Sequence, residues 1–166
     1  MLAYSKVCLN DLRTGSAKGS YILVAKLDVE KEIPVGSLGV VAFQEGFYAY
    51  LGSALGGFKS RVNRHLIKSK TPKWHIDYLL NEASLLQVFL CETERRLECL
   101  LSRVMIDEIS FIPDFGSSDC RCQSHLYFAN DKLGLQLGIR KAVAEIALPY
   151  ESFKEMIGFE EKNWLL

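Results

Sequence analysis

Residues 19–25 read GSYILVA, a β-branched and aromatic run that follows a polar leader. The pattern predicts a buried strand that begins near Ser20. Residues 40–43 and 47–51 predict two further short extended pieces, and the glycine-rich residues 52–57 end them. A small sheet is therefore expected at the centre of the fold.

Helical periodicity follows this strand region. Apolar residues recur at positions 58, 62 and 66 with basic residues between them, which predicts an amphipathic helix over about 58–69. The remaining elements are predicted as a short helix from after Pro72 to about Glu82, a strand over 85–90, a helix over about 94–108 with Thr93 as N-cap, a strand within 124–128, and helical residues from 135 to 159 with a break at Pro149. The predicted class is mixed α and β.

The composition indicates one globular domain. Apolar residues make up 49% of the 166 residues and charged residues 24%, values that exclude a disordered or collagen-like chain. Lysine and arginine together number 20, as do aspartate and glutamate, so no net charge draws the chain to nucleic acids. The charge is uneven, however: residues 1–90 hold 11 basic and 7 acidic side chains, and residues 91–166 hold 9 and 13. Any attraction to an anionic partner must therefore be local.

Cysteine number and apolar run length predict the compartment. Five cysteines are an odd number, and the first residues lack the order of a secretory signal, so reduced thiols in the cytoplasm are expected. The longest apolar runs are far shorter than the roughly 20 residues that cross a bilayer, so no membrane partner is expected. The sequence sets no oligomeric state.

Two tyrosine motifs stand at the two ends of the predicted sheet region. GSY at residues 19–21 opens the first strand, YLG at 50–52 closes the last extended piece, and Arg61 and His65 follow one turn apart on the helix. Two later blocks read WHIDYL at residues 74–79 and GSSDCRC at residues 116–122. This ordered set resembles the GIY-YIG nuclease superfamily, in particular a branch found alone or fused to endonuclease III-type DNA glycosylases. The resemblance covers about residues 19–130.

The resemblance implies a fold and an activity. The fold would be α/β of the α+β kind, with a small, mostly antiparallel sheet flanked by helices. The activity would be metal-dependent hydrolysis of phosphodiester bonds in DNA, in repair or in the processing of structured DNA. The implied partners are DNA and a DNA glycosylase or another repair protein.

The resemblance also implies roles for five residues. Tyr21 matches a tyrosine that is proposed to activate water or act as general base, and Tyr50 matches a tyrosine that orders the site. Arg61 would stabilise charge on the scissile phosphate, with His65 one turn further on the same helix face. Glu98 matches the carboxylate that would bind one Mg²⁺ or Mn²⁺ ion.

The chain departs from the family pattern in its first motif and in its spacing. The motif reads Gly-Ser-Tyr in place of Gly-Ile-Tyr, and 29 positions separate Tyr21 from Tyr50. An inserted hairpin would account for this long gap. Glu92 and Glu94 compete with Glu98 for the metal, and Glu98 is preferred because it lies in the helix interior beside the apolar stripe.

A basic stretch surrounds the predicted catalytic arginine. Residues 59–73 carry six cations and no acid, and a tryptophan follows them. Cations at this density neutralise DNA phosphates, and an aromatic ring stacks on a base. The nucleic-acid contacts predicted here, besides Arg61, are Lys59, Arg64, Lys68, Lys70, Lys73 and Trp74. The alternative is a solvated basic helix.

Cysteine and histidine residues lie close together in and just after the GSSDCRC block at residues 116–122. One interpretation is a zinc site with Cys120, Cys122 and His125 as ligands and a fourth from His75 or Asp77. The favoured interpretation is a buried loop without zinc, held by Asp119 and by the hydroxyl groups of Ser117 and Ser118, because a Cys-x-Cys pair is a weak zinc signal. A second interpretation without zinc is a polar cluster near the nuclease centre that consists of His75, Asp77, Ser118 and Asp119.

The chain is expected to comprise an N-terminal leader over residues 1–18, a GIY-YIG-like domain over 19–134, and a C-terminal helical extension over 135–166 packed on the same domain. Two other functions stay open. One is a non-catalytic nucleic-acid-binding or accessory module of a DNA repair enzyme, and the other is a zinc-stabilised interaction domain. In either case Tyr21 and Tyr50 would be ordinary packing residues.

Overall fold

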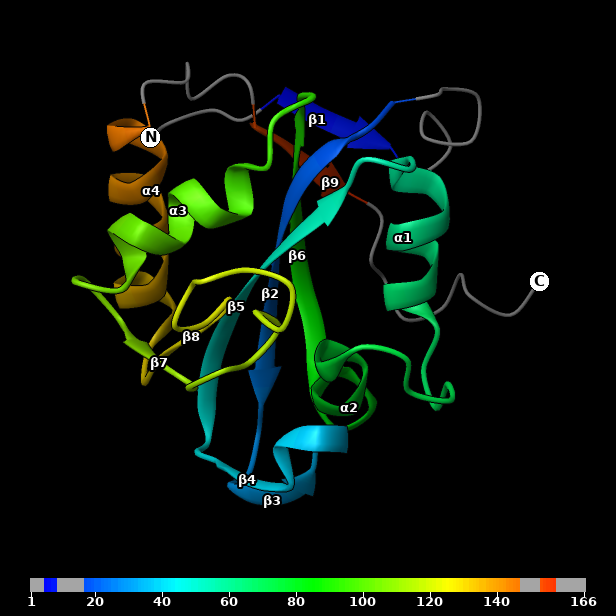
Figure 1. Cartoon of the computed structure of the whole chain (residues 1–166), viewed down its shortest axis with the longest axis vertical. Coiled ribbons are helices and arrows are strands. Elements are labelled where there is room, and N and C mark those ends of the chain that lie inside the picture. Colours follow the sequence, from blue (N-terminus) through cyan, green and yellow to red (C-terminus); the bar gives the residue numbers. More distant parts are fainter. Residues whose placement is uncertain (1–4, 9–16, 147–152, 158–166) are drawn as a thin grey trace.

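The computed structural model describes residues 5–8, 17–146 and 153–157 (Figure 1). Within these residues the chain forms nine strands, four α-helices and one short 3-10 helix. In chain order they are β1 (Ser5–Cys8), β2 (Gly19–Leu27), β3 (Lys31–Pro34), the 3-10 helix η2 (Gly36–Leu38), β4 (Val40–Phe43), β5 (Gly46–Ala54), α1 (Phe58–Leu66), α2 (His75–Glu82), β6 (Ser84–Glu92), α3 (Leu97–Met105), β7 (Ser110–Phe111), β8 (Leu126–Ala129), α4 (Lys132–Glu145) and β9 (Phe153–Ile157).

Seven of the strands form one sheet in the order β1-β9-β6-β2-β5-β8-β7. Every pair in it is antiparallel except β1 with β9, which confirms the expected α+β class with a mostly antiparallel sheet. The central ladder sets Tyr21 opposite Gly52 and Leu23 opposite Tyr50. Since side chains two residues apart on a strand share a face, the two motif tyrosines are diagonal neighbours on one face of the sheet.

Each face of the sheet is covered by a separate helical layer. Tyr21 and Leu23 of β2 contribute to a core shared with α1, α2 and the β3–β4 hairpin, whereas Ile22 and Val24 contribute to a second core shared with α3 and α4. Figure 1 shows α3 and α4 on one side of the sheet and α1 and α2 on the other. Successive residues of β2 face the two cores alternately, and both cores are buried. Residues 21–25 are therefore apolar without interruption.

The first three helices follow the predicted apolar spacing, with one shifted start. In α1, Phe58 and Val62 are buried as expected. Helix α3 begins at Leu97 rather than at residue 94, and Thr93 does not cap it. The Thr93 hydroxyl instead accepts a hydrogen bond from the Arg95 N–H at 3.0 Å, which stabilises a turn before the helix.

The long gap between the tyrosine motifs is filled by a hairpin, as the sequence predicts. Strands β3 and β4 pair with each other in a separate two-stranded sheet. Ile33, Val35 and Phe43 are buried in the first core, so the hairpin forms part of the domain. Figure 1 shows it at the end of the large sheet opposite to the end where β5 leads into α1.

The two flanking segments differ from the prediction. Residues 153–157, expected to be helical, form strand β9, which pairs with β6 and with β1 from the expected leader. Pairing explains both strands. Strand β9 supplies partners to the backbone N–H and C=O groups at the edge of β6, and β1 does the same for the outer edge of β9. The remaining residues of the expected leader and extension, 1–4, 9–16, 147–152 and 158–166, lie outside the described residues.

The expected boundary at residue 134 also falls inside an element. It lies within α4, which begins at Lys132. Asp131 is the N-cap of this helix, and its side chain accepts a hydrogen bond from the Gly134 N–H at 2.8 Å. Leu135 and Ile139 of this helix are buried in the second core. Helix α4 is therefore part of the central fold. None of the described helices is both long enough and apolar enough to span a membrane.

Candidate active site

A cavity of about 460 Å³ opens where β2 begins and β5 ends. Its wall includes four of the residues predicted as catalytic, namely Tyr21, Tyr50, Arg61 and Glu98. The fifth, His65, lies behind Tyr21 and contacts its hydroxyl group. The fold thus gathers side chains from β2, β5, α1 and α3 that are far apart in the sequence.

The position of the cavity follows from an incomplete sheet edge. Strand β8 pairs only with the part of β5 that precedes Leu51, and in the described part of the chain no strand pairs with residues 51–54 on that side. A single bond, from the Leu51 N–H to the His125 carbonyl at 2.9 Å, continues the contact. Because this edge is open, Glu98 from one helical layer and Arg61 from the other reach the same space.

Tyr21 and Tyr50 lie beside each other in the cavity wall. Their ring centroids are 6.5 Å apart, and Tyr21 is only 2% exposed. The Tyr21 ring packs against the backbone of Gly52, where a Cβ atom would lie 2.2 Å from the Tyr21 Cζ atom. Burial raises the pKa of both phenols, so both hydroxyl groups are protonated at neutral pH.

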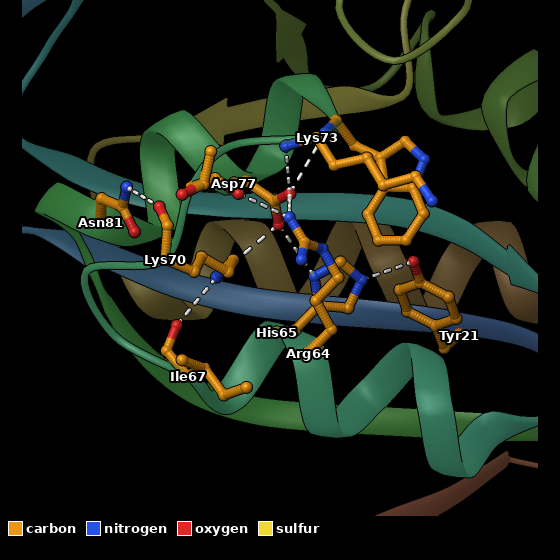
Figure 2. A network of polar contacts seen from close by, with 10 residues as sticks. Tyr21, Arg64, His65, Ile67, Lys70, Lys73, Asp77 and Asn81 are labelled. Atoms are coloured by element: carbon orange, nitrogen blue, oxygen red, sulfur yellow. Dashed lines mark hydrogen bonds and ion pairs between the residues drawn. The ribbon is translucent and has the colours of Figure 1, made fainter.

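Tyr21, His65 and Asp77 form a connected series (Figure 2). The Tyr21 hydroxyl lies 2.8 Å from His65 Nε2, and His65 Nδ1 lies 3.8 Å from Asp77 Oδ1. Burial lowers the pKa of His65 to about 3, so its ring is neutral. A neutral ring carries one proton, and the carboxylate favours placing it on Nδ1. Nε2 then accepts the hydrogen bond from Tyr21, and the lone pairs of the phenol oxygen stay available toward the cavity.

Asp77 is the hub of this network and is fully buried. Its Oδ2 atom accepts hydrogen bonds from Arg64 at 2.8 Å and from the N–H groups of Lys73 and Trp74 at 2.8 and 3.1 Å. Lys70 Nζ lies 3.6 Å from Oδ1. Burial alone would raise the pKa of Asp77, but these hydrogen bonds and the Lys70 charge lower it below its ordinary value. Asp77 is therefore ionised and structural, and it does not line the cavity.

The structure divides the predicted nucleic-acid contacts into two groups. Arg64 and Lys70, expected to contact DNA, are directed to Asp77 and neutralise it. Lys59, Lys68 and Lys73 are exposed. The sequence alone could not separate the two groups, because it does not show which cations of the stretch the fold directs to Asp77.

Arg61, Lys73 and Trp74 make a cationic wall of the cavity. The Arg61 guanidinium lies 4.0 Å from the centre of the Trp74 ring, and Lys73 Nζ lies 5.1 Å from it. Stacking fixes the plane of the guanidinium group. A planar donor group held in this way suits the oxygen atoms of a phosphate.

Glu98 is the predicted metal ligand, and it lines the cavity while only 5% exposed. Its Oε2 atom accepts a hydrogen bond from the Ser20 hydroxyl at 3.0 Å, which fixes the carboxylate beside the start of β2. The competing Glu92 and Glu94 are exposed, and Glu94 pairs with Lys18 at 3.0 Å. One fixed carboxylate facing an open cavity fits a Mg²⁺ ion that keeps several of its waters.

The loop before β8 forms the opposite wall. Of the predicted polar cluster, His75, Ser118 and Asp119 line the cavity. His75 Nδ1 accepts a hydrogen bond from the Gly116 N–H at 3.1 Å, and Asp119 Oδ2 lies 3.5 Å from a guanidinium nitrogen of Arg96. The Nδ1 atom of His75 is therefore hydrogen-bonded to the loop backbone.

Behind this wall lies a cluster of three cysteines and one histidine. Cys99, Cys120, Cys122 and His125 place one ligand atom each within 4.8 Å of the others. The cluster contains the three predicted zinc ligands, but Cys99 replaces His75 or Asp77 as the fourth member. Burial raises the pKa of the Cys99 thiol, and Cys122 and Cys120 raise it further, since neighbouring thiolates repel each other.

Cys99 is the residue of this cluster that the sequence reading missed. It follows Glu98 directly in α3 and lies 21 positions before Cys120. No regular metal-ligand spacing links them. The only sequence signal is a cysteine on the face of an amphipathic helix that is next to the apolar stripe, which by itself is a weak indication.

Comparisons with known proteins identify a family. A family model described as Domain of unknown function DUF123 matches residues 20–148. No curated protein and no solved structure matches the chain significantly. The matched residues run from the start of β2 past the end of α4 and include all of the described cavity wall. The chain therefore belongs to the family Domain of unknown function DUF123.

Proposed function

We propose that the protein is a metal-dependent DNA endonuclease of the GIY-YIG kind. The observation that supports this proposal most is the meeting of Tyr21, Tyr50, Arg61 and Glu98 around one cavity. Each of these residues taken singly is also compatible with ordinary packing, and their common position around one cavity is what favours a shared site. A cavity of about 460 Å³ with an open edge has room for a sugar-phosphate unit.

In the proposed reaction, the scissile phosphate lies between Arg61 and Glu98. Arg61 binds the non-bridging oxygens and stabilises the negative charge that develops on them. Glu98 would hold a Mg²⁺ or Mn²⁺ ion, which when bound neutralises charge on the phosphoryl group. Tyr21, oriented by His65, accepts a hydrogen bond from the attacking water with its phenol oxygen. The water oxygen forms a new bond to phosphorus while the bond from phosphorus to one sugar oxygen breaks, and the proton that the water loses is balanced by the one that the leaving sugar oxygen takes up.

The surface beside the cavity suits a nucleic acid. Lys73 and Trp74 lie in the cavity wall, and Lys59 and Lys68 are exposed on and after the helix that carries Arg61. Cations that contact successive phosphates release counterions, so DNA binding by this surface would weaken steeply as salt increases. DNA is accordingly the proposed partner, with a glycosylase or other repair protein as a second one, and the cytoplasm as the compartment.

The proposal is tested by cleavage of labelled single-stranded, duplex, flapped and branched DNA with Mg²⁺ or Mn²⁺. The variant Glu98→Gln keeps the shape and the hydrogen bond to Ser20 but removes the charge that holds the metal. We expect it to lower metal-dependent cleavage by at least about a hundredfold. The matched control is Glu94→Gln, an exposed acid four residues earlier, which should cleave as the wild type does.

Two results would contradict the nuclease proposal. One is cleavage by Glu98→Gln at the wild-type rate. The other is an absence of cleavage of every substrate by the folded wild type with either metal. If salt-sensitive DNA binding persisted in that case, the protein would be a non-catalytic module, and Arg61 and Lys73 would serve as DNA contacts only.

A further inference from the structure

We propose that Cys99, Cys120, Cys122 and His125 form a structural zinc site that fixes the wall of the cavity to helix α3. The zinc proposal does not rest on the proposed nuclease activity, because it is argued from the positions of these four side chains alone. It also differs from the site expected from the sequence, since the fourth ligand is a helix cysteine in place of a histidine or an aspartate.

The ligand distances agree with tetrahedral zinc. Bonds of about 2.3 Å to sulfur and about 2.0 Å to nitrogen place sulfur and nitrogen about 3.6 Å apart around the ion, and two sulfurs about 3.8 Å apart. The Sγ atoms of Cys120 and Cys99 lie 3.6 and 4.0 Å from His125 Nε2. All four ligand atoms lie within 4.8 Å of one another, so small rotations of the side chains complete the tetrahedron.

The ring of His125 is also oriented for metal binding. Its Nε2 atom faces the cysteines, and the backbone of Gly116 lies near the ring. Zinc-bound histidines in proteins usually donate their other ring N–H to a carbonyl or a carboxylate, which sets the ring orientation and leaves one nitrogen for the ion. His125 is 4% exposed and the three cysteines are half-buried, which suits a closed site.

The donor set selects the metal. Three thiolates and one imidazole prefer a borderline-soft ion such as Zn²⁺ to a hard ion such as Mg²⁺. Four protein ligands leave no open position, which is typical of a structural site and not of a catalytic one. Three thiolates around Zn²⁺ carry one net negative charge. Arg103 and Arg121 would offset this charge, because they line the cavity of about 420 Å³ into which the cysteines open.

The site would join two segments that need a fixed relation. Residues 112–125 run from β7 to β8 without forming a helix or strand, and segments of this length are uncommon in a compact domain unless they are held or functional. This segment supplies Ser118, Asp119 and His125 to the cavity wall, while α3 supplies Glu98. A zinc ion bound by Cys99 and by this segment would therefore set the distance across the cavity.

The first test is the metal content of the purified full-length chain. We expect about one zinc per chain by mass spectrometry, and release of that zinc when a mercurial reagent blocks the thiols. Replacement by Co²⁺ should give sulfur-to-cobalt charge-transfer absorption and the intense visible bands of a tetrahedral ion. Neither measurement depends on DNA cleavage, so the zinc proposal and the nuclease proposal can fail separately.

Cysteine variants identify the ligands. Cys99→Ser and Cys122→Ser should lose their zinc on dialysis against a chelator, under conditions in which the wild type retains it. The matched control is Cys91→Ser, a buried cysteine of β6 outside the cluster, which should retain one zinc per chain. If either ligand variant fails to fold, the wild-type zinc content and cobalt spectrum still decide the question.

Three results would overturn the proposal. The first is a folded wild type that contains no zinc and takes up neither Zn²⁺ nor Co²⁺ in titration. The second is a native disulfide bond between two of the three cysteines. The third is a cobalt spectrum that lacks thiolate charge transfer, or that is unchanged by Cys99→Ser.

Discussion

At the scale of single residues, the site depends on a contact between a tyrosine ring and a glycine. The ring of Tyr21 lies where a side chain on Gly52 would be, and three of its atoms would come within 2.5 Å of a Cβ atom there. The phenol is also held from behind by His65. Gly52 is therefore required by packing, and its backbone conformation needs no left-handed φ angle.

The substitution Gly52→Ala should displace the Tyr21 ring and destabilise the fold. Overpacking of this kind costs about 1–3 kcal/mol in free energy of unfolding, which urea denaturation measures. The control is Gly56→Ala, where a Cβ atom meets nothing within 4 Å, and which should stay within about 0.5 kcal/mol of the wild type. Equal stability of the two variants would contradict the close packing at residue 52.

His65 should make the stability of the protein depend on pH. Its folded-state pKa, lowered by burial to about 3, lies below the ordinary value of 6.5. Between these values the unfolded chain binds a proton that the folded protein does not. The free energy of unfolding therefore decreases as the pH falls through this range, by up to about 1.4 kcal/mol per pH unit for this residue.

The variant His65→Gln tests this assignment, since it removes the titrating ring and retains a polar side chain near Tyr21. Urea denaturation at several pH values should show a shallower dependence in the variant than in the wild type. His75 and His125, whose pKa values are also lowered by burial, contribute the same sign in both proteins. Parallel pH profiles would show that His65 does not titrate in this way.

At the scale of elements, α1 and α2 are joined through one carboxylate. Asp77 in the first turn of α2 receives Arg64 from α1 and Lys70 from the connecting segment. Asp77 also accepts hydrogen bonds from the N–H groups of Lys73 and Trp74, just before its own helix. An acidic side chain is favoured at this end of a helix. Asp77 therefore stabilises the first turn of α2 and also holds α1 in place. Helix α1 carries His65 and Arg61, so their positions depend on this carboxylate as well.

The variant Asp77→Asn should be strongly destabilised. It leaves the positive charges of Arg64 and Lys70 without their buried counter-ion, a change that costs about 3–5 kcal/mol. The control is Glu82→Gln in the same helix, which breaks an exposed pair with Lys31 and should cost less than about 1 kcal/mol. Urea denaturation of both variants measures the difference. A loss at Asp77→Asn no larger than at Glu82→Gln would make the network energetically unimportant.

Most elements could be predicted from local patterns, and the exceptions have a common cause. The strand from Gly19, the helix from Phe58 and the helix that carries Leu101 follow from apolar periodicity. Strand β9 was mistaken for a helix, because its conformation is set by pairing with β6 and β1. Pairing across long sequence separations leaves no local signal.

At the scale of the whole molecule, the site lies where two helical layers meet around a sheet edge. The resemblance supplied Tyr21, Arg61 and Glu98, but neither periodicity nor spacing indicates that they share a cavity. Their meeting depends on β8 being too short to cover the end of β5. Cys99 was missed for the same reason, because only the fold brings α3 against the segment before β8.

The place of the β3–β4 hairpin has a consequence for how related sites should be sought. Residues 28–45, which are this hairpin and its connections, make up most of the 28 residues between Tyr21 and Tyr50. The hairpin lies at the end of the sheet away from the start of β2, where the cavity opens (Figure 1). The pairing of Tyr21 with Gly52 depends on the ladder between β2 and β5, and the length of chain between these strands does not enter it. Gap length between the motifs is thus a poor search criterion. A cross-strand pairing rule, with tyrosine facing glycine and any number of residues between, would find the same architecture in chains whose insertions differ.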